Sequence, residues 1–348
     1  MRRFRLLLPA LVSLLALAVP SASFPPPAAG QRPPQRIVAI GDVHGADTSF
    51  AAILKKAGLI DEQQRWSGGN AILVQTGDMT DRGAGMRAAL DLLMKIEKQA
   101  SKAGGRVHAL LGNHEVMNML GDMRDASPEI FATFGGEEAM REAFGPRGTY
   151  GRWLRSHQVV VEIDDWIFMH AGIDPSFSDA SLNEINRRAR REIEEWDDGV
   201  KFLERRKLLA ASPKLLEAAQ AAQLELERLV SSTNRDQPDV QRDAAVLIPL
   251  ANIGTSSLFS PNGPLWFRGF ASWRDSEGDA HVSALLQKFR AEHFVSGHTV
   301  QPQGRISERF GGKLFLIDTG MLNGKFFPSG RPSALEIVDN VARPLYLD

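Results

Sequence analysis

The chain has 348 residues, and its 41 Lys and Arg nearly balance its 42 Asp and Glu. Hydrophobic residues make up 43% of the chain, which excludes a disordered protein, and the lack of a basic excess argues against a nucleic-acid partner. The absence of cysteine excludes disulfides, thiolate metal sites and cysteine nucleophiles, so any metal must be bound by His, Asn and carboxylate groups. The length fits roughly two domains, or one large α/β domain with an insertion.

The N-terminus has the features of a secretory signal. Arginines precede an apolar run over residues 6–19, and small residues follow directly before Phe24. This pattern predicts a cleaved signal peptide over residues 1–23. A buried N-terminal helix and an uncleaved membrane anchor are the alternatives, although the apolar run is short for a membrane span. We therefore expect a periplasmic or secreted protein with no stable membrane span after cleavage.

The rest of the chain divides into a linker and one domain. Recurring prolines predict an extended linker over residues 24–35, and the globular domain is expected over residues 36–348. Within the domain, apolar residues at helical spacing predict amphipathic helices over residues 182–196 and 215–229, which form a helical insertion at about 180–230. These helices either pack onto the body of the domain or form a lid over its site.

Five short apolar runs in the domain are each followed by glycine or a polar turn; they are residues 36–40, 71–75, 107–111, 166–169 and 293–296. Such runs are typical of buried strands. Helices expected over residues 48–57 and 84–102 separate the first three runs, which gives βαβαβ order and the start of a parallel sheet. Ligands bind at the carboxyl ends of such strands. The residues that follow the runs are therefore the candidate functional residues.

The candidate residues carry oxygen and imidazole donors and no sulfur; they are Asp42, His44, Asp78, Asn113, His170 and His298. Divalent metals of the manganese, iron and zinc type accept this combination of donors. A carboxylate such as that of Asp78 can bridge two ions, and two ions roughly 3.5–4 Å apart activate a water and neutralise the oxygens of a phosphoryl centre. We therefore expect two divalent metal ions and hydrolysis of a phosphoester.

The motifs occur in a fixed order: Gly41-Asp42-Val43-His44-Gly45, Gly77-Asp78-Met79-Thr80-Asp81-Arg82-Gly83, Gly112-Asn113-His114-Glu115, His170-Ala171-Gly172 and Gly297-His298. This ordered set resembles the signature of the phosphoprotein phosphatase family of metallophosphoesterases. The secretory start and the segments over residues 264–269 and 317–320 are similar to the bacterial, Shewanella-like branch. The resemblance implies an α/β fold: a calcineurin-like metallophosphoesterase β-sandwich flanked by helices, here with a helical insertion.

The resemblance also implies a role for each motif residue. One metal ion would be bound by Asp42, His44 and Asp78, and the other by Asp78, Asn113, His170 and His298. His114 would donate a proton to the leaving oxygen, with Asp81 orienting its ring. Arg82, Asn113 and Arg268 would bind phosphate oxygens. Two residues have an alternative role. Arg268 could instead be a surface residue that stacks on Trp266. Asp318 could line the site, but a role in a turn is favoured.

These features predict a metal-dependent phosphomonoesterase that acts on a phosphorylated protein or peptide, or on a small phosphomonoester. The branch it resembles favours phosphotyrosine, with phosphoserine and phosphothreonine peptides as further substrates. One alternative is a dinucleoside polyphosphate or other nucleotide phosphohydrolase, but such relatives lack the acid at Asp81 and carry Asp where Glu115 stands. A second alternative, a periplasmic binding module on an inactive phosphatase fold, predicts a missing metal ligand, and no ligand is missing.

Overall fold

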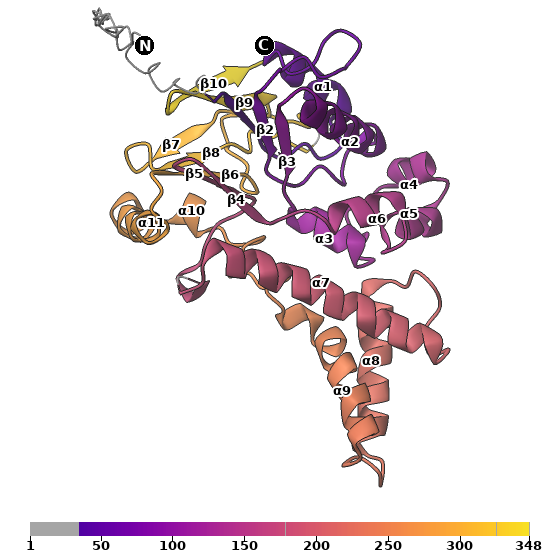
Figure 1. Ribbon diagram of the computed structural model, residues 1–348. Helices are drawn as coiled ribbons and strands as arrows, with labels where there is room; N and C mark the ends of the chain where they lie inside the picture. The colour runs from indigo at the N-terminus through magenta and orange to yellow at the C-terminus, as the bar shows by residue number, and fades with distance from the viewer. Residues whose placement is uncertain (1–34, 178, 325, 348) are drawn as a thin grey trace, which may run out of the picture. The chain divides into compact units, whose positions relative to one another are not determined.

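The structure is a computed structural model that describes residues 35–177, 179–324 and 326–347 (Figure 1). The predicted signal peptide and almost all of the predicted linker lie outside the described residues. Among the described helices, none is both long enough and apolar enough to span a bilayer.

The first sheet has the strand order β10-β9-β1-β2-β3. Its parallel part consists of β1 (Ile37–Ile40), β2 (Ile72–Gln75) and β3 (Arg106–Ala109). The strands β9 (Ser333–Val338) and β10 (Val341–Tyr346) extend it in antiparallel orientation from the other end of the chain. The predicted βαβαβ order is confirmed, because α1 (Asp47–Lys56) and α2 (Met86–Lys102) connect the parallel strands.

The second sheet has the order β4-β5-β6-β8-β7. Its strands are β4 (Val160–Ile163), β5 (Trp166–Met169), β6 (His293–Ser296), β7 (Ser307–Arg309) and β8 (Leu314–Leu316). The three central strands β5, β6 and β8 run parallel, and the outer two are antiparallel to their neighbours. Parallel strands again end at one edge of the sheet, as in the first sheet.

An apolar layer joins the two sheets. Ile72 and Val74 of β2 lie in one buried cluster with Trp166 and Phe168 of β5 and with Val295 of β6. Side chains alternate along a strand, so the other face of each sheet packs against helices; Leu73, for example, is buried in the cluster that contains α1 and α2. This is the predicted β-sandwich flanked by helices.

Helices fill the two long connections of the domain. Between β3 and β4 lie α3 (Asn113–Met119), α4 (Pro128–Phe134), α5 (Glu137–Phe144) and α6 (Thr149–Leu154). Between β5 and β6 lie α7 (Leu182–Arg205), α8 (Leu215–Val230), α9 (Pro238–Ala251), α10 (Gly269–Ser272) and α11 (Asp275–Phe289), with short 3₁₀ turns at Pro175–Phe177 and Ile253–Thr255.

The insertion contains one more helix than the sequence analysis expected. Helix α7 starts as predicted but continues to Arg205, because Phe202 and Leu203 extend its buried face. Helix α9 begins at Pro238, beyond the predicted end of the insertion at about residue 230, and it includes an internal proline at Pro249. Figure 1 shows α8 and α9 side by side, extending from one end of α7 away from the sheets, so these two helices pack on each other and on α7.

Candidate active site

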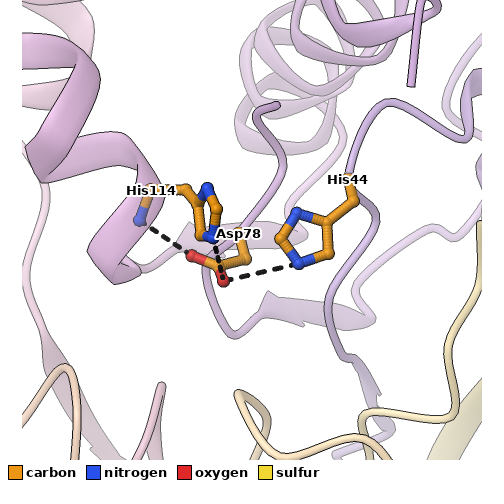
Figure 2. Close-up of side chains that lie close together, drawn as sticks. All are labelled: His44, Asp78 and His114. Atoms are coloured by element: carbon orange, nitrogen blue, oxygen red, sulfur yellow. Dashed lines mark hydrogen bonds and ion pairs between the residues drawn. The ribbon is translucent and has the colours of Figure 1, made fainter. Parts of the chain in front are cut away.

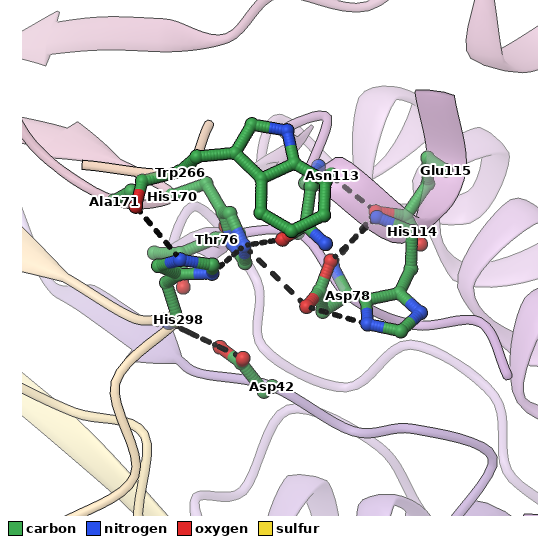
Figure 3. A network of polar contacts seen from close by, with 12 residues as sticks. Asp42, Thr76, Asp78, Asn113, His114, Glu115, His170, Ala171, Trp266 and His298 are labelled. Atoms are coloured by element: carbon green, nitrogen blue, oxygen red, sulfur yellow. Dashed lines mark hydrogen bonds and ion pairs between the residues drawn. The ribbon is translucent and has the colours of Figure 1, made fainter. Parts of the chain in front are cut away.

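Loops from both sheets converge on one centre (Figure 3). The first sheet contributes Asp42 after β1, Asp78 after β2, and Asn113 and His114 at the start of α3. The second sheet contributes His170 after β5 and His298 after β6. All of these side chains are buried. The structure therefore brings together every residue predicted to bind a metal ion.

One group of donors surrounds the Asp78 carboxylate on the side of His44 (Figure 2). The Nε2 atom of His44 lies 3.6 Å from Asp78 Oδ2. The same atom lies 3.8 Å from Asp42 Oδ2. The Nδ1 atom of His44 lies 2.9 Å from the carbonyl oxygen of Thr80 and donates to it, so Nε2 is left free to bind a cation. This geometry fits the predicted first ion, with Asp42, His44 and Asp78 as ligands.

The second group lies on the other side of Asp78. His170 Nε2 is 3.4 Å from Asp78 Oδ2, 3.0 Å from Asn113 Oδ1 and 3.1 Å from His298 Nδ1. The other ring nitrogens face carbonyl oxygens: His170 Nδ1 donates to Thr76, and His298 Nε2 donates to Trp266. With both rings neutral, the two imidazole nitrogens that face each other would both carry lone pairs. A shared cation resolves this arrangement, so the residues fit a bound metal ion.

The charges of the site also fit divalent cations. Burial lowers the pKa of His44 to about 3 and, together with the neighbouring His170, lowers the pKa of His298 to about 2, so both imidazoles are neutral, as metal ligation requires. Burial raises the pKa of Asp42 well above its usual value, and the carboxylates of Asp318 and Asp78 raise it further. The three buried carboxylates of Asp42, Asp78 and Asp318 lie near these neutral imidazoles. Their negative charge, when they are ionised, is one that bound cations would compensate.

Several site residues have a left-handed backbone, which is costly for residues other than glycine. The φ angle is 47° at His44, 56° at Asp78 and 64° at His298. The turn that carries the second motif continues this conformation, with φ of 69° at Asp81 and 65° at Arg82. Such strain persists only where the surroundings hold the backbone in place, and it concentrates at functional sites.

The carboxylate of Glu115 supplies much of this support. It accepts hydrogen bonds from the backbone N–H groups of Asp78 at 2.7 Å, Met79 at 2.9 Å and Thr80 at 3.1 Å. It also accepts from the N–H of Gly112, at 2.8 Å, in front of its own helix. The sequence analysis used Glu115 only to distinguish enzyme classes. Its role in holding the Asp78 turn follows only from the structure.

The predicted proton donor, His114, is hydrogen-bonded to the carboxylate of Asp81. His114 Nδ1 donates to Asp81 Oδ2 at 2.7 Å, and Asn118 Nδ2 lies 3.0 Å from both Asp81 oxygens. Burial opposes a proton on His114, but the carboxylates of Asp78 and Asp81 outweigh it and raise the pKa of His114 to about 9. Asn118 was missed by the sequence analysis, although its position one helical turn after His114 was the available signal.

The two predicted phosphate-binding arginines lie beside different histidines of the site. Arg82 Nη2 is 3.3 Å from His114 Nε2. The exposed Arg268 donates to Thr299 Oγ1 at 3.1 Å and to the carbonyl oxygen of His298 at 3.3 Å. A cavity of about 470 Å³ lies beside it, lined by Arg124, Phe259, Pro261, Trp266 and Arg268. Neither α7 nor α8 contributes to this lining, which argues against a lid.

Asp318 combines the expected turn role with a place in the site. Its Oδ1 atom accepts from the N–H of Gly320 at 3.0 Å, as a turn residue would. Its Oδ2 atom is buried and has no hydrogen-bond partner among the described residues. Burial raises the pKa of this carboxyl to about 6, and the Asp78 carboxylate raises it as well. Like the other site residues, Asp318 follows a parallel strand, here β8, and that position was the signal in the sequence.

Comparison with known proteins agrees with this geometry. Residues 35–302 match the family of calcineurin-like phosphoesterases. Shewanella-like protein phosphatase 1 of Plasmodium berghei (strain Anka) is 28% identical over 315 residues, which cover 90% of this chain and 74% of that protein. Shewanella-like protein phosphatase 2 of Arabidopsis thaliana is 31% identical over 211 residues, covering 48% of this chain and 53% of that protein.

Among solved structures, the cold-active protein-tyrosine phosphatase of a psychrophilic Shewanella species is similar, with 26% identity and a TM-score of 0.62 over 90% of this chain and 80% of that chain. The family match covers most of the described residues, and two buried groups of side chains could each hold a metal ion: His44, Asp78 and His114, and Asp78, His170 and His298. The chain therefore belongs to the calcineurin-like metallophosphoesterases and is a phosphatase with an intact site for metal ions.

Proposed function

We propose that this phosphatase hydrolyses phosphomonoesters on proteins or peptides, with phosphotyrosine as the favoured residue, and that it uses two divalent metal ions. The observation that carries the proposal is the arrangement around Asp78. Its carboxylate lies between His44 Nε2 on one side and His170 Nε2 on the other, at 3.6 Å and 3.4 Å. A carboxylate with an imidazole nitrogen from each group of ligands beside it is the arrangement that a pair of ions needs.

The two ions would supply Lewis-acid activation of a water and would neutralise the phosphoryl oxygens. Asp42, His44 and Asp78 would hold the first ion, and Asp78, Asn113, His170 and His298 would hold the second. We propose manganese, iron or zinc, because these metals accept mixed oxygen and imidazole ligands.

The residues of this chain would then bind the substrate and move one proton. The guanidinium groups of Arg82 and Arg268, together with the Asn113 amide, would bind the nonbridging phosphate oxygens. His114 would give its Nε2 proton to the leaving oxygen as the bond to phosphorus breaks. Asp81 would hold the His114 ring through Nδ1 and stabilise its charged form, which the 2.7 Å hydrogen bond supports.

The proposed substrate class rests on the similar proteins and on the presence of Asp81 beside His114. One similar structure is that of a protein-tyrosine phosphatase, and two similar proteins are named protein phosphatases. The Asp81–His114 pair supports a phosphomonoesterase over a nucleotide phosphohydrolase, in which this acid is expected to be absent. A periplasmic or secreted location is proposed from the signal-like N-terminus alone.

A substrate panel with metal analysis tests the proposal. The purified protein should contain two divalent ions per chain and should release phosphate from phosphotyrosine peptides faster than from phosphoserine peptides or dinucleoside polyphosphates. Faster cleavage of the dinucleoside polyphosphate would favour the nucleotide alternative. A protein that binds both ions but hydrolyses none of these substrates would refute the proposed activity.

A further inference from the structure

The loop after β8 carries an aromatic ring to the metal site. Its described residues are 318–324 and 326–332, and Phe327 lies half-buried within it. The Phe327 ring centre is 6.2 Å from that of His44, and the Arg82 guanidinium carbon lies 5.4 Å from the Phe327 ring centre. From the sequence, this loop has no predicted role beyond the turn at Asp318 and the resemblance of residues 317–320 to one branch of the family.

The loop is shaped so that Phe327 reaches this position. Gly320 has a φ of 70°, and a Cβ atom there would lie 2.8 Å from Phe327 Cβ. The N–H of Gly330 donates to the carbonyl oxygen of Phe327 at 2.8 Å, and the N–H of Arg331 donates to Thr319 at 3.0 Å. The base of the loop is therefore closed by hydrogen bonds, and glycine is needed where it passes under Phe327.

The same loop also packs against the turn of the second motif. Leu322 Cδ1 lies so close to Gly83 that a Cβ atom on that glycine would be 2.8 Å away. Leu322 and Phe327 therefore contact neighbouring residues, Gly83 and Arg82, from one side. Because these contacts are independent, the position of the ring does not depend on a single interaction.

The position of the proton donor shows where the organic part of a substrate must lie. Arg82 Nη2 is 3.3 Å from His114 Nε2, and the rings of His44 and His114 are 4.8 Å apart. A proton donor must lie within hydrogen-bond distance of the leaving oxygen. The group attached to that oxygen therefore leaves on the side of His114, Arg82 and Phe327, whereas Trp266 lies beside His298, with its ring centre 6.0 Å from the imidazole.

We infer that Phe327 forms a wall of the leaving-group subsite and that it selects aromatic leaving groups over alkyl ones. A tyrosyl ring is attached directly to the leaving oxygen and can pack against Phe327, whereas a seryl or threonyl leaving group has no ring at this distance. Aromatic pairs of this kind favour offset or edge-to-face contact. This inference rests on the proposed phosphomonoesterase activity and names the residue that sets its preference.

The test compares two peptides of identical sequence that carry phosphotyrosine or phosphoserine at the same position. In Phe327→Leu, kcat/KM for the phosphotyrosine peptide should fall ~3-fold to 10-fold more than for the phosphoserine peptide, the range expected for loss of one aromatic contact. Phe327→Tyr keeps the ring and should keep the wild-type ratio. Phe310→Leu is the matched control, because Arg309 also lies over that ring, 4.4 Å from its centre, but Phe310 packs against Gly278 of α11.

Metal content is measured in parallel, so that damage to the site is recognised. If Phe327→Leu binds less metal than the wild type, the comparison is made with Phe327→Met instead. Methionine fills the volume without a ring, so this variant should lower the ratio of phosphotyrosine to phosphoserine turnover in the same way. An equal loss on both peptides in either variant would show that the ring only supports Arg82, and it would overturn the inference. A wild-type protein that hydrolyses neither peptide would instead refute the proposed function.

Discussion

The N–H of Asp78 donates a hydrogen bond to the Glu115 carboxylate at 2.7 Å, so a buried acid outside the proposed set of metal ligands holds the residue that lies between the two groups of ligands. Glu115 accepts from neighbouring N–H groups as well, and an amide in its place would turn one acceptor oxygen into a donor that faces other donors. The left-handed backbone at Asp78 would lose its main support.

Glu115→Gln is therefore expected to weaken metal binding by about 10-fold to 100-fold, as loss of a residue that orients a ligand typically does. Metal titration of the chelator-treated variant measures this. Glu162→Gln, on an exposed position of β4, is the control and should bind metal like the wild type. Unchanged affinity in Glu115→Gln would mean that the Asp78 turn keeps its shape without this carboxylate.

Removal of metal should abolish phosphatase activity, because activation of the water depends on the bound ions. Treatment with a chelator followed by dialysis gives the metal-free protein, and addition of manganese, or of manganese with zinc, should restore turnover. Phosphate release before and after addition is the measurement. Full activity in protein shown to be free of metal would contradict a metal-dependent mechanism.

Asp78→Asn should impair the enzyme more than Asp42→Asn or His298→Ala, because Asp78 lies between both groups of ligands. We expect at least a ~100-fold loss of affinity for the ions in Asp78→Asn, the upper end of what loss of an outer partner costs. Metal stoichiometry distinguishes the variants: Asp78→Asn should lose both ions, and the other two should each lose one. Equal losses in all variants would argue against a bridging role.

His114→Asn should keep both metal ions but slow hydrolysis of alkyl phosphates by ~100-fold to 10,000-fold, the usual contribution of a positioned proton donor. The loss should be smaller for para-nitrophenyl phosphate, since para-nitrophenolate leaves without a proton. Steady-state rates on this substrate and on a phosphoserine peptide give the comparison. The same loss on both substrates would instead indicate damage to the metal site.

Arg268→Lys should reduce turnover nearly as much as Arg268→Ala, because lysine cannot bind two phosphate oxygens with a planar fork. A loss of ~10-fold to 100-fold is expected, in line with a hydrogen bond between charged groups. Arg274→Lys, at the exposed start of α11, is the control for the same substitution on the surface and should keep wild-type turnover. Wild-type turnover in Arg268→Lys would assign Arg268 to the surface, where its bonds to Thr299 and His298 fix it structurally.

The sequence predicts well which candidate residues come together, because each follows a short apolar run and parallel strands place such residues at one edge of a sheet. Asp42 and His298 are 256 residues apart, yet the His298 N–H donates to Asp42 Oδ1 at 3.0 Å. The order of the motifs, rather than any one of them, makes this closeness predictable.

Other parts of the site depend on contacts that no local pattern encodes. Glu115 and Phe327 act through the backbone or ring of residues far away in the chain, so their neighbours become apparent only in the folded structure. Helix α9 was missed for a different reason, since its first turn lies in a polar segment and Pro249 interrupts its helical pattern. Its stability comes from packing on α7 and α8, which outweighs the local propensity.

The proposed ligands of the second ion come from both sheets and from widely separated parts of the chain. Asp78 and Asn113 precede the insertion, whereas His298 follows it and lies directly after β6. During synthesis, a chain that has not yet reached β6 contains most of the ligands but cannot form the complete second site. Loading of the second ion must therefore follow completion of almost the whole domain, and a chain truncated before residue 293 should be unable to bind that ion tightly however its N-terminal part folds.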